Sequence, residues 1–442
     1  MKEGLKKRRV RLQAGVRYLF PVICIMLFLT GAAPADERKE EKTSTTSQLY
    51  AQSAVLMDAD NGRILLEKNG TDILPMASTT KIMTCIVTLE QGNLSDMASV
   101  SAYAASQPKV HLGAQKGEYY KIEDLLYSLM LESHNDAAVI IAEYYGSRWA
   151  GLSSDLSSHS AEESKKAVLA FTAKMNEAAQ KIGCTDTFFV TPNGLDGTLT
   201  VQKDEETIEK NHSTTARDLA RIMSYCITDS PAKESFLQIT QTAAYSYSNY
   251  KTDSQSGEFL PGSRTISCNN HNAFLQMMEG ALSGKTGFTG KAGYCYVGAL
   301  TKDGKTFVVA LLACGWPNNK TWKWHDTKLL MEYGLENYEK RDIYEGRKLA
   351  PVIVENGQQE WAALAAEEKE IELLLGPSDS VEVKWTLPDL LTAPVAKGEV
   401  VGKESFYVNG ELYASIPVTA AEDVPEVTYR YCIRQVFRAA FL

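Results

Sequence analysis

The stretch from Pro75 to Leu89 reads Pro-Met-Ala-Ser-Thr-Thr-Lys-Ile-Met-Thr-Cys-Ile-Val-Thr-Leu, and the rest of the chain is organised around it. From Ile82 onward it carries no charge, which predicts a helix buried on nearly all sides. Ser78 and Lys81 stand three residues apart and so share one face of the first turns. A lysine that heads a buried helix must be paired or lose its proton. A neutral lysine beside a serine hydroxyl is a general base beside a nucleophile.

The serine–lysine spacing is a weak signal by itself, because short patterns recur by chance. The same S-x-x-K pattern occurs three more times, at Ser106/Lys109, Ser230/Lys233 and Ser248/Lys251. The apolar run after Lys81 is what distinguishes the first occurrence. Chance therefore stays open as an alternative until other parts of the chain are considered.

The first 35 residues have the organisation of a targeting segment. A basic region from Lys2 to Arg17 precedes an apolar run from Leu19 to Leu29, and the small residues Ala33-Pro34-Ala35 follow. This order predicts a secretory signal peptide cut before Asp36. An uncleaved membrane anchor is the alternative, although the apolar run is short for a membrane span.

Charge argues against a nucleic-acid partner. The chain of 442 residues has a formal net charge of −9, and residues 1–35 contribute seven basic groups and one acid. Their removal takes away a net +6 and leaves −15 on the exported protein. An acidic protein is repelled by phosphate backbones, so we expect no nucleic-acid binding.

The cysteines indicate neither a zinc site nor a disulfide framework. Seven remain after residue 35, odd in number, dispersed, and without C-x-x-C spacing. Such cysteines are typical small core residues. A disulfide between Cys295 and Cys314, across a predicted hairpin, is the one pairing that the spacing leaves open.

Turn signals and periodicity divide the chain into elements. We expect a flexible lead-in at residues 36–50, because it is polar and charged. Strands are predicted at 54–57 and 64–66 around Asn61-Gly62, and at 293–301 and 305–314 around Asp303-Gly304. Helices are predicted at 122–145, with a break at 131–136, and at 165–182; residues 229–263 appear polar and irregular.

Two further polar motifs lie among these elements. Ser133 and Asn135 stand on the break between two apolar helices, where helix capping is the ordinary interpretation. Lys285-Thr286-Gly287 opens a strand-like stretch, and its ordinary interpretation is an edge strand with a solvated lysine. Gly287 suits the close approach of a ligand to the backbone.

The composition changes after about Tyr338. Residues 340–422 alternate like strands, at 371–384 and 398–417 above all, and we expect a small all-β domain there. Residues 427–442 have a helical pattern in which Arg430, Arg434 and Arg438 form one basic stripe beside apolar positions. This predicts an in-plane helix on a membrane surface, the alternative being a terminal helix docked on the protein.

Taken in order, Ser78/Lys81, Ser133/Asn135 and Lys285-Thr286-Gly287 form a trio. The trio resembles the S-x-x-K, S-D-N and K-T-G elements of penicillin-binding proteins and class A β-lactamases, with the middle motif in the S-x-N form of the low-molecular-mass D-alanyl-D-alanine carboxypeptidases. With Asp136-Ala137 after the middle motif, the chain is identified as a member of the low-molecular-mass D-alanyl-D-alanine carboxypeptidases. The resemblance covers almost the whole mature chain. It departs from class A β-lactamases in the middle motif and in lacking an obvious deacylating glutamate loop.

The resemblance implies an α+β, β-lactamase/transpeptidase-like fold, with a five-stranded antiparallel sheet and a helical cluster. It implies a catalytic domain at 51–339, a β-rich domain at 340–422 and a membrane-association helix at 427–442. It places the protein at the outer face of the cytoplasmic membrane. The implied partners are the peptidoglycan stem peptide and β-lactam antibiotics, with no metal or organic cofactor.

The same resemblance implies a chemistry for each motif. Ser78 attacks the bond between the two terminal D-alanines, Lys81 takes the serine proton, and Ser133 relays protons. Asn135, Lys285, Thr286 and Gly287 bind substrate. The backbone N–H groups of Ser78 and Phe288 form the oxyanion hole, and water hydrolyses the acyl-serine.

Two other functions stay open from the sequence. A D,D-transpeptidase or endopeptidase would use the same residues with another acceptor or another bond. A non-catalytic cell-wall binding protein would keep the fold without the reaction, although the intact trio argues against this.

Overall fold

The computed structural model describes residues 43–441 except 204–205, 254, 345, 347 and 368. The predicted signal peptide and the first part of the lead-in lie outside the described residues. The described chain divides into two compact units. The larger unit runs to residue 348 and includes residues 368–379, and the β-rich unit comprises residues 349–367 and 380–441.

An antiparallel sheet of five strands forms the centre of the larger unit, as predicted. Its spatial order is β2 (Ile64–Lys68), β1 (Ser53–Asp58), β11 (Lys305–Leu312), β10 (Gly293–Lys302) and β9 (Ala281–Thr289). The β10–β11 turn has positive φ at both Asp303 (52°) and Gly304 (72°), the geometry that favours Asp-Gly in hairpins. Strand β9 is an edge strand, so one side of its backbone is open to a ligand.

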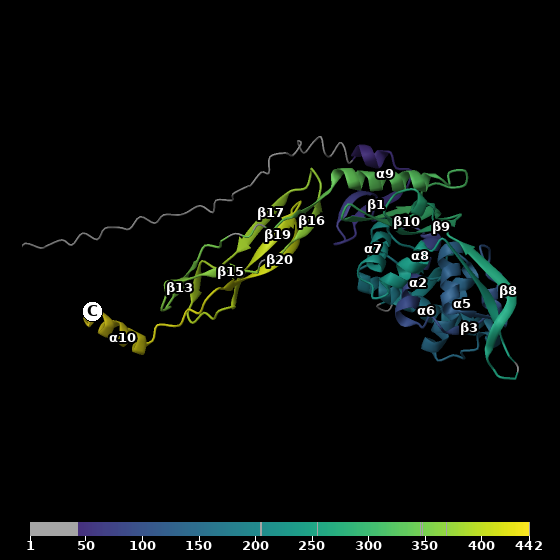
Figure 1. The fold of residues 1–442 in the computed structure, drawn as a ribbon, viewed down its shortest axis with the longest axis horizontal. Coiled ribbons are helices and arrows are strands. Elements are labelled where there is room, and N and C mark those ends of the chain that lie inside the picture. Colours follow the sequence, from purple (N-terminus) through teal and green to yellow (C-terminus); the bar gives the residue numbers. More distant parts are fainter. Residues whose placement is uncertain are drawn as a thin grey trace, which may run out of the picture. The chain divides into compact units, whose positions relative to one another are not determined.

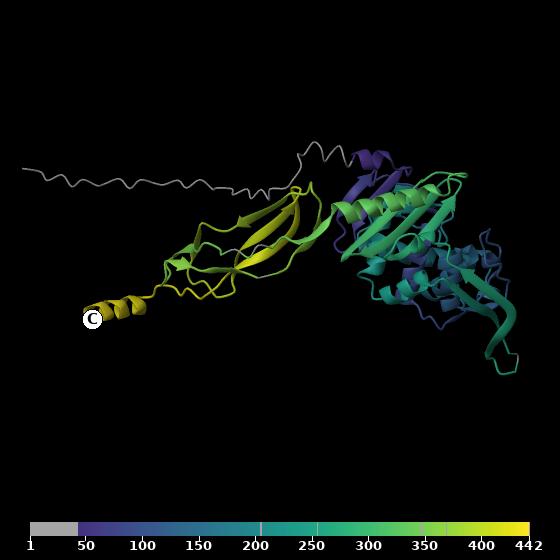
Figure 2. The ribbon, with the colours of Figure 1, turned by 45° about the horizontal axis from the view of Figure 1, so that its top comes forward.

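Both faces of this sheet are covered, which explains why β1 is buried at every position. Val55 and Met57 pack into one core with the helices α2 (Lys81–Gln91), α5 (Asn135–Ala150), α6 (Ala161–Ile182), α7 (Ala216–Ile227) and α8 (Lys233–Gln241). Ala54 and Leu56 point the other way and pack against α9 (Trp322–Asn337). Figures 1 and 2 show α9 on the opposite side of the sheet from these five helices.

Shorter elements complete the larger unit. The break predicted within residues 122–145 is present: α4 (Ile122–Tyr127) runs into a π-helical turn at Ser128–Glu132, and α5 begins at Asn135. The remaining short elements are η1 (Ala77–Thr80), β3 (Met97–Ser99), α3 (Ala102–Ala105), β4 (Tyr119–Lys121), η3 (Leu156–Ser158), β5 (Thr198–Lys203), β6 (Glu206–Asn211) and η4 (Ala273–Gln276).

The expectation of irregular structure at residues 229–263 was wrong. The segment contains α8 and most of a long hairpin, β7 (Ala244–Thr252) and β8 (Phe259–Asn269). The strands are only half-buried, with polar residues on the open face, so their composition is that of a loop. Pairing of β7 with β4, at Tyr250 and Tyr119, joins the hairpin to the unit.

The end of the lead-in is ordered rather than flexible. Residues 43–47 are helical, and Leu49 is buried in the core beneath α9. The ring of Tyr50 stacks on that of Trp322, with 4.2 Å between ring centroids. These apolar contacts offset the loss of chain entropy that a polar lead-in would otherwise keep.

The β-rich unit contains short strands around a small core that includes Val354, Val395 and Val424. Its strands are β13 (Val352–Glu355), β14 (Trp361–Ala362), β15 (Leu364–Ala366), β17 (Val381–Thr386), β18 (Leu390–Thr392), β19 (Val400–Val408) and β20 (Glu411–Ala420). The strand-like stretch 371–384 divides between the units: β16 (Glu372–Leu375) pairs with β12 (Glu339–Asp342) in the larger one.

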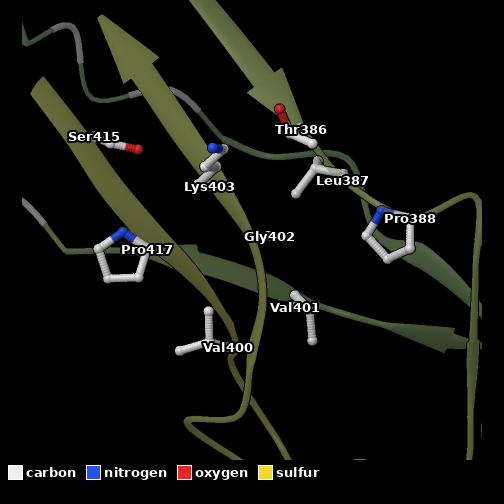
Figure 3. A pocket seen from close by; sticks show the side chains of 9 residues that line it. All are labelled: Thr386, Leu387, Pro388, Val400, Val401, Gly402, Lys403, Ser415 and Pro417. Atoms are coloured by element: carbon white, nitrogen blue, oxygen red, sulfur yellow. The ribbon is translucent and has the colours of Figure 1, made fainter. Parts of the chain in front are cut away.

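A groove of about 660 Å³ lies beside a bulge in β19 of this unit. Figure 3 shows Leu387, Pro388, Val400, Val401 and Pro417 around it. None of the site residues predicted from the sequence lines this groove.

The chain ends in α10 (Tyr429–Ala440), none of whose residues is buried. Val436 is 68% and Phe437 59% exposed. Among residues 43–441, gaps aside, no helix is both long and apolar enough to cross a bilayer.

Candidate active site

Ser78 lies in η1, a tight turn that runs directly into α2 with Lys81 as its first residue. Ala77, just before the serine, has a φ of +49°, an unusual conformation for a residue with a side chain. The turn brings Lys81 Nζ to 2.9 Å from Ser78 Oγ. Ser78 is half-buried and Lys81 is fully buried, so the pair sits where the helix meets a solvent-accessible surface.

The surroundings of Lys81 favour its neutral form. Burial lowers the pKa of its amine far below the usual value, and the positive charge of Lys285 lowers it further. Asp136 opposes these effects but does not outweigh them. A lysine whose neutral form is favoured in this way is suited to accept a proton.

The hydrogen bonds of Lys81 Nζ indicate where its lone pair points when the amine is neutral. Nζ is 2.9 Å from Asn135 Oδ1 and 2.5 Å from the Asn193 carbonyl, and neither oxygen can donate. The amide of Asn135 is oriented by Nδ2, which donates to the carbonyl of Pro108 at 3.0 Å. A neutral amine has two N–H groups, which these two oxygens occupy. Its lone pair is therefore left facing the hydroxyl of Ser78.

The middle motif contributes two side chains to the site. Ser133 is the C-cap of the π-helical turn, with a φ of +64°, and its Oγ accepts from Lys285 Nζ at 3.0 Å. Asn135 bonds Lys81, while His134 holds the N-cap position of α5 without a side-chain cap. The capping interpretation is therefore confirmed for the backbone of Ser133 and wrong for Asn135.

The K-T-G stretch lies on β9 and packs on the nucleophile turn. The Lys285 side chain is buried, so the solvated edge lysine is also excluded. Burial lowers the pKa of Lys285 to about 7, and its Nζ also donates to the Thr286 carbonyl at 2.9 Å. A Cβ on Gly287 would stand 2.9 Å from Ser78 N. Glycine therefore lets the strand approach the serine this closely.

The structure thus joins most of the predicted residues by direct contact. Ser78, Lys81 and Asn135 form one hydrogen-bonded group, Ser133 and Lys285 another, and Gly287 touches the backbone of Ser78. Thr286 is half-buried beside Lys285. The side chain of Phe288 stays outside this group: it is 42% exposed and packs on Tyr294, and its expected role concerns only its backbone N–H.

Two contributors were missed from the sequence. The carbonyl of Asn193 accepts from Lys81, and a backbone atom has no signature except the Asn-Gly turn around it. The carboxylate of Asp136 accepts from the backbone N–H groups of Leu112, Gly113 and Ala114, which fixes the loop before β4. The Cys295–Cys314 pairing does not form, since both thiols are free and buried.

Comparison with known proteins shows which family the chain resembles. A family model described as D-alanyl-D-alanine carboxypeptidase matches residues 39–151 and 160–314. A second, described as the C-terminal domain of penicillin-binding protein 5, matches residues 338–426. The D-alanyl-D-alanine carboxypeptidase DacF of Bacillus subtilis (strain 168) is 27% identical over 421 residues, covering 93% of this chain and 96% of the relative.

Solved structures agree in fold. The D-alanyl-D-alanine carboxypeptidase DacD from Francisella tularensis aligns with a TM-score of 0.61 at 24% identity, covering 86% of this chain and 95% of that one. The Streptomyces K15 DD-transpeptidase aligns with a TM-score of 0.51 at 28% identity, covering 65% and 98%. The chain therefore belongs to the D-alanyl-D-alanine carboxypeptidase family, serine-type hydrolases among the low-molecular-mass penicillin-binding proteins that act on peptidoglycan.

Proposed function

We propose that Ser78 is the nucleophile and Lys81 its general base in the removal of the terminal D-alanine from stem pentapeptides. The observation that carries this proposal is the set of bonds around Lys81 Nζ. Nζ lies 2.9 Å from Ser78 Oγ and also bonds two carbonyl-type oxygens. In the neutral amine these two oxygens take both N–H groups, which leaves the lone pair for the hydroxyl of Ser78.

The reaction runs in two halves. Ser78 Oγ forms a bond to the carbonyl carbon between the two D-alanines while its proton passes to Lys81 Nζ. The backbone N–H groups of Ser78 and Phe288 hold the oxyanion. The C–N bond then breaks, its nitrogen takes a proton, and D-alanine leaves. Water attacks the acyl-serine and regenerates the hydroxyl.

The remaining residues of the site hold the substrate. Lys285, when protonated, and Thr286 bind the terminal carboxylate of the peptide. Ser133, whose hydroxyl accepts from Lys285, passes the proton to the leaving nitrogen in this proposal. Asn135 orients Lys81 through its amide oxygen and positions the substrate. A β-lactam has the same carboxylate and a reactive amide, so it acylates the same serine.

Incubation of the purified chain with a fluorescent penicillin, followed by peptide mapping in a mass spectrometer, tests the assignment. We expect one adduct, on Ser78, and no adduct with Ser78→Ala. The same measurement on Ser248→Ala, which removes the serine of another S-x-x-K pattern, should give wild-type labelling. An adduct on any other residue would show that the nucleophile is misassigned.

A D,D-transpeptidase is a second candidate, because the aligned Streptomyces K15 protein is a DD-transpeptidase. The acylation residues would be the same, and only the acceptor of the acyl group differs. Product analysis on a pentapeptide, with and without an amine acceptor, separates the two. A carboxypeptidase releases the tetrapeptide in both cases.

The location of the enzyme is also part of the proposal. We infer export through residues 1–35, and peripheral attachment to the outer face of the cell membrane through residues 427–442. The exposed apolar side chains of α10, beside the stripe of Arg430, Arg434 and Arg438, support attachment. We also propose a catalytic domain at 51–339 and a β-rich domain at 340–422; the larger compact unit extends further than this catalytic domain, to residue 348, and also includes residues 368–379.

A further inference from the structure

His212 is a buried side chain that the reaction above does not use. It follows β6, it is 3% exposed, and its backbone N–H donates to the Gly197 carbonyl at 2.9 Å. Ser213 and Thr214, the next two residues, form bridges to Phe188 and Leu74. His212 is thus held on a rigid extended segment beneath the Ser78 turn.

The imidazole ring accepts hydrogen bonds at one nitrogen and donates at the other. Nδ1 is 3.0 Å from the backbone N of Val190 and 3.3 Å from that of Thr191. Both partners donate, so Nδ1 carries no hydrogen and the hydrogen lies on Nε2. Nε2 is 2.7 Å from Thr80 Oγ1, whose own hydrogen goes to the Ala77 carbonyl at 2.7 Å. Each donor in this series of hydrogen bonds, from Val190 and Thr191 through His212 and Thr80 to Ala77, therefore has one acceptor.

The chain of bonds connects the two backbone segments on which the reaction depends. One end is the Ala77 carbonyl, which fixes the peptide unit leading into Ser78. The other end is the loop that contains Asn193, the acceptor of Lys81. The segments also touch directly: a Cβ on Gly194 would stand only 2.0 Å from Ala77 O.

His212 keeps this arrangement across the working pH range. Burial, with a smaller effect from the charge of Lys81, lowers its pKa to about 3. The imidazole is therefore neutral, and both of its nitrogens hold their roles. A cation here would place a hydrogen on Nδ1, against two backbone N–H groups.

We propose that His212 is a positioning residue for acylation, holding Ser78 and Lys81 in register by way of Thr80 and the Asn193 loop. The inference rests on the roles proposed for Ser78 and Lys81. It assigns His212 no contact with substrate and no proton transfer.

The main test substitutes Thr80, because its variants disturb packing least. Thr80→Val removes the hydroxyl at nearly constant volume, and Thr80→Ser keeps it. Stopped-flow labelling of the full chain with a fluorescent penicillin separates the acylation rate constant k2 from the dissociation constant K of the reversible complex. We expect Thr80→Val to lower k2 about 10- to 100-fold with K unchanged. Thr80→Ser should restore most of k2.

A matched control lies on the same helix. The hydroxyl of Thr88 is buried and donates to the Thr84 carbonyl at 2.7 Å, two turns from the site. Thr88→Val should lose comparable thermal stability but leave k2 within about twofold of the wild-type value. If both valine variants lower k2 equally, the effect is one of general stability and the proposal is wrong.

Substitution of His212 itself tests the rest of the chain of bonds. His212→Gln keeps an N–H that reaches toward Thr80, whereas His212→Phe fills the space without a polar atom. We expect a larger loss of k2 with phenylalanine than with glutamine. Thr80→Val and His212→Phe combined should lower k2 less than the product of the single effects, because both break one connected path.

The outcomes separate this inference from the proposed function. Labelling that survives Ser78→Ala would overturn the function itself. Loss of labelling with Ser78→Ala, together with a wild-type k2 in folded Thr80→Val and His212→Phe, would overturn only the role of His212. A change confined to K would also overturn it, since positioning of the nucleophile acts on k2.

Discussion

The Ser78 site and the C-terminal helix each reverse the usual distribution of residues between the interior and the surface. The site buries charged residue types, and the helix exposes apolar ones. The site takes two lysines inside, with Lys81 at 0% and Lys285 at 3% exposure. Helix α10 leaves apolar side chains outside, with Val436 68% exposed. Burial of a charge and exposure of a large apolar group both cost free energy. In this chain both departures coincide with regions for which a function is proposed.

The largest expected effect comes from removing the amine of the buried Lys81. Lys81→Met should lower the rate of penicillin acylation by about 10²- to 10⁴-fold, because the general base is lost. Lys323→Met is the matched control, since Lys323 is also 3% exposed and has a pKa lowered to about 8 by burial. Its acylation rate should stay near the wild-type value. Equal losses in both variants would mean that any buried lysine matters only through stability.

The second effect is a dependence on pH. Burial lowers the pKa of Lys285 to about 7, and its proposed role needs the protonated form. The ratio k2/K reports ionisation of the free enzyme, so it should fall by about 50-fold between pH 7 and pH 9. Lys285→Arg keeps its charge over this range, and its slower reaction should not show this fall. A wild-type profile that is flat to pH 9 would contradict the assignment.

A smaller effect concerns the close contact of β9 with the nucleophile turn. Gly287→Ala places a methyl group against Ser78 N and should lower acylation about 10-fold by displacing the strand. Gly290, three residues further along, has open space around the position of a Cβ. Gly290→Ala should therefore leave the rate unchanged. A wild-type rate for Gly287→Ala would show that the strand can shift without consequence.

The smallest effect on acylation is expected from substitution of the exposed apolar side chains of α10. Val436→Ser with Phe437→Ser should weaken binding to phosphatidylglycerol vesicles while leaving acylation in solution unchanged. Gln435→Ser, on the polar face of α10, should bind vesicles like the wild-type chain. Salt should weaken binding further, because the arginine stripe acts electrostatically. Equal vesicle binding by all three proteins would remove the attachment proposal.

The sequence predicted those parts of the site that local pattern decides. Ser78 and Lys81 are fixed by a three-residue spacing and an uncharged helix, and the β10–β11 hairpin by Asp303-Gly304. In these cases neighbouring residues in the sequence determine both the local conformation and the reactive groups. The break around Ser133 was visible for the same reason, although its π-helical turn was not.

The rest depends on contacts between distant residues. The acceptor at Asn193 is a carbonyl oxygen, which every residue has, and only the fold directs it at Lys81. The β7–β8 hairpin was missed because its strands are polar on one face. Residues 372–375 lie within a stretch predicted to belong to the β-rich domain, yet they pair with β12 in the larger unit. Nothing local to these segments encodes such pairing.

The two buried lysines of the site, Lys81 and Lys285, also affect which mutants a selection for stability would favour. In the unfolded chain Lys285 would bind a proton up to about pH 10.5, whereas in the folded protein burial brings its pKa to about 7. The unfolded state thus holds more protons between these values, so the stability of the fold rises with pH across that window and is diminished at neutrality. Mutants screened for heat resistance alone should accumulate neutral residues at these two positions, becoming more robust as they become inert.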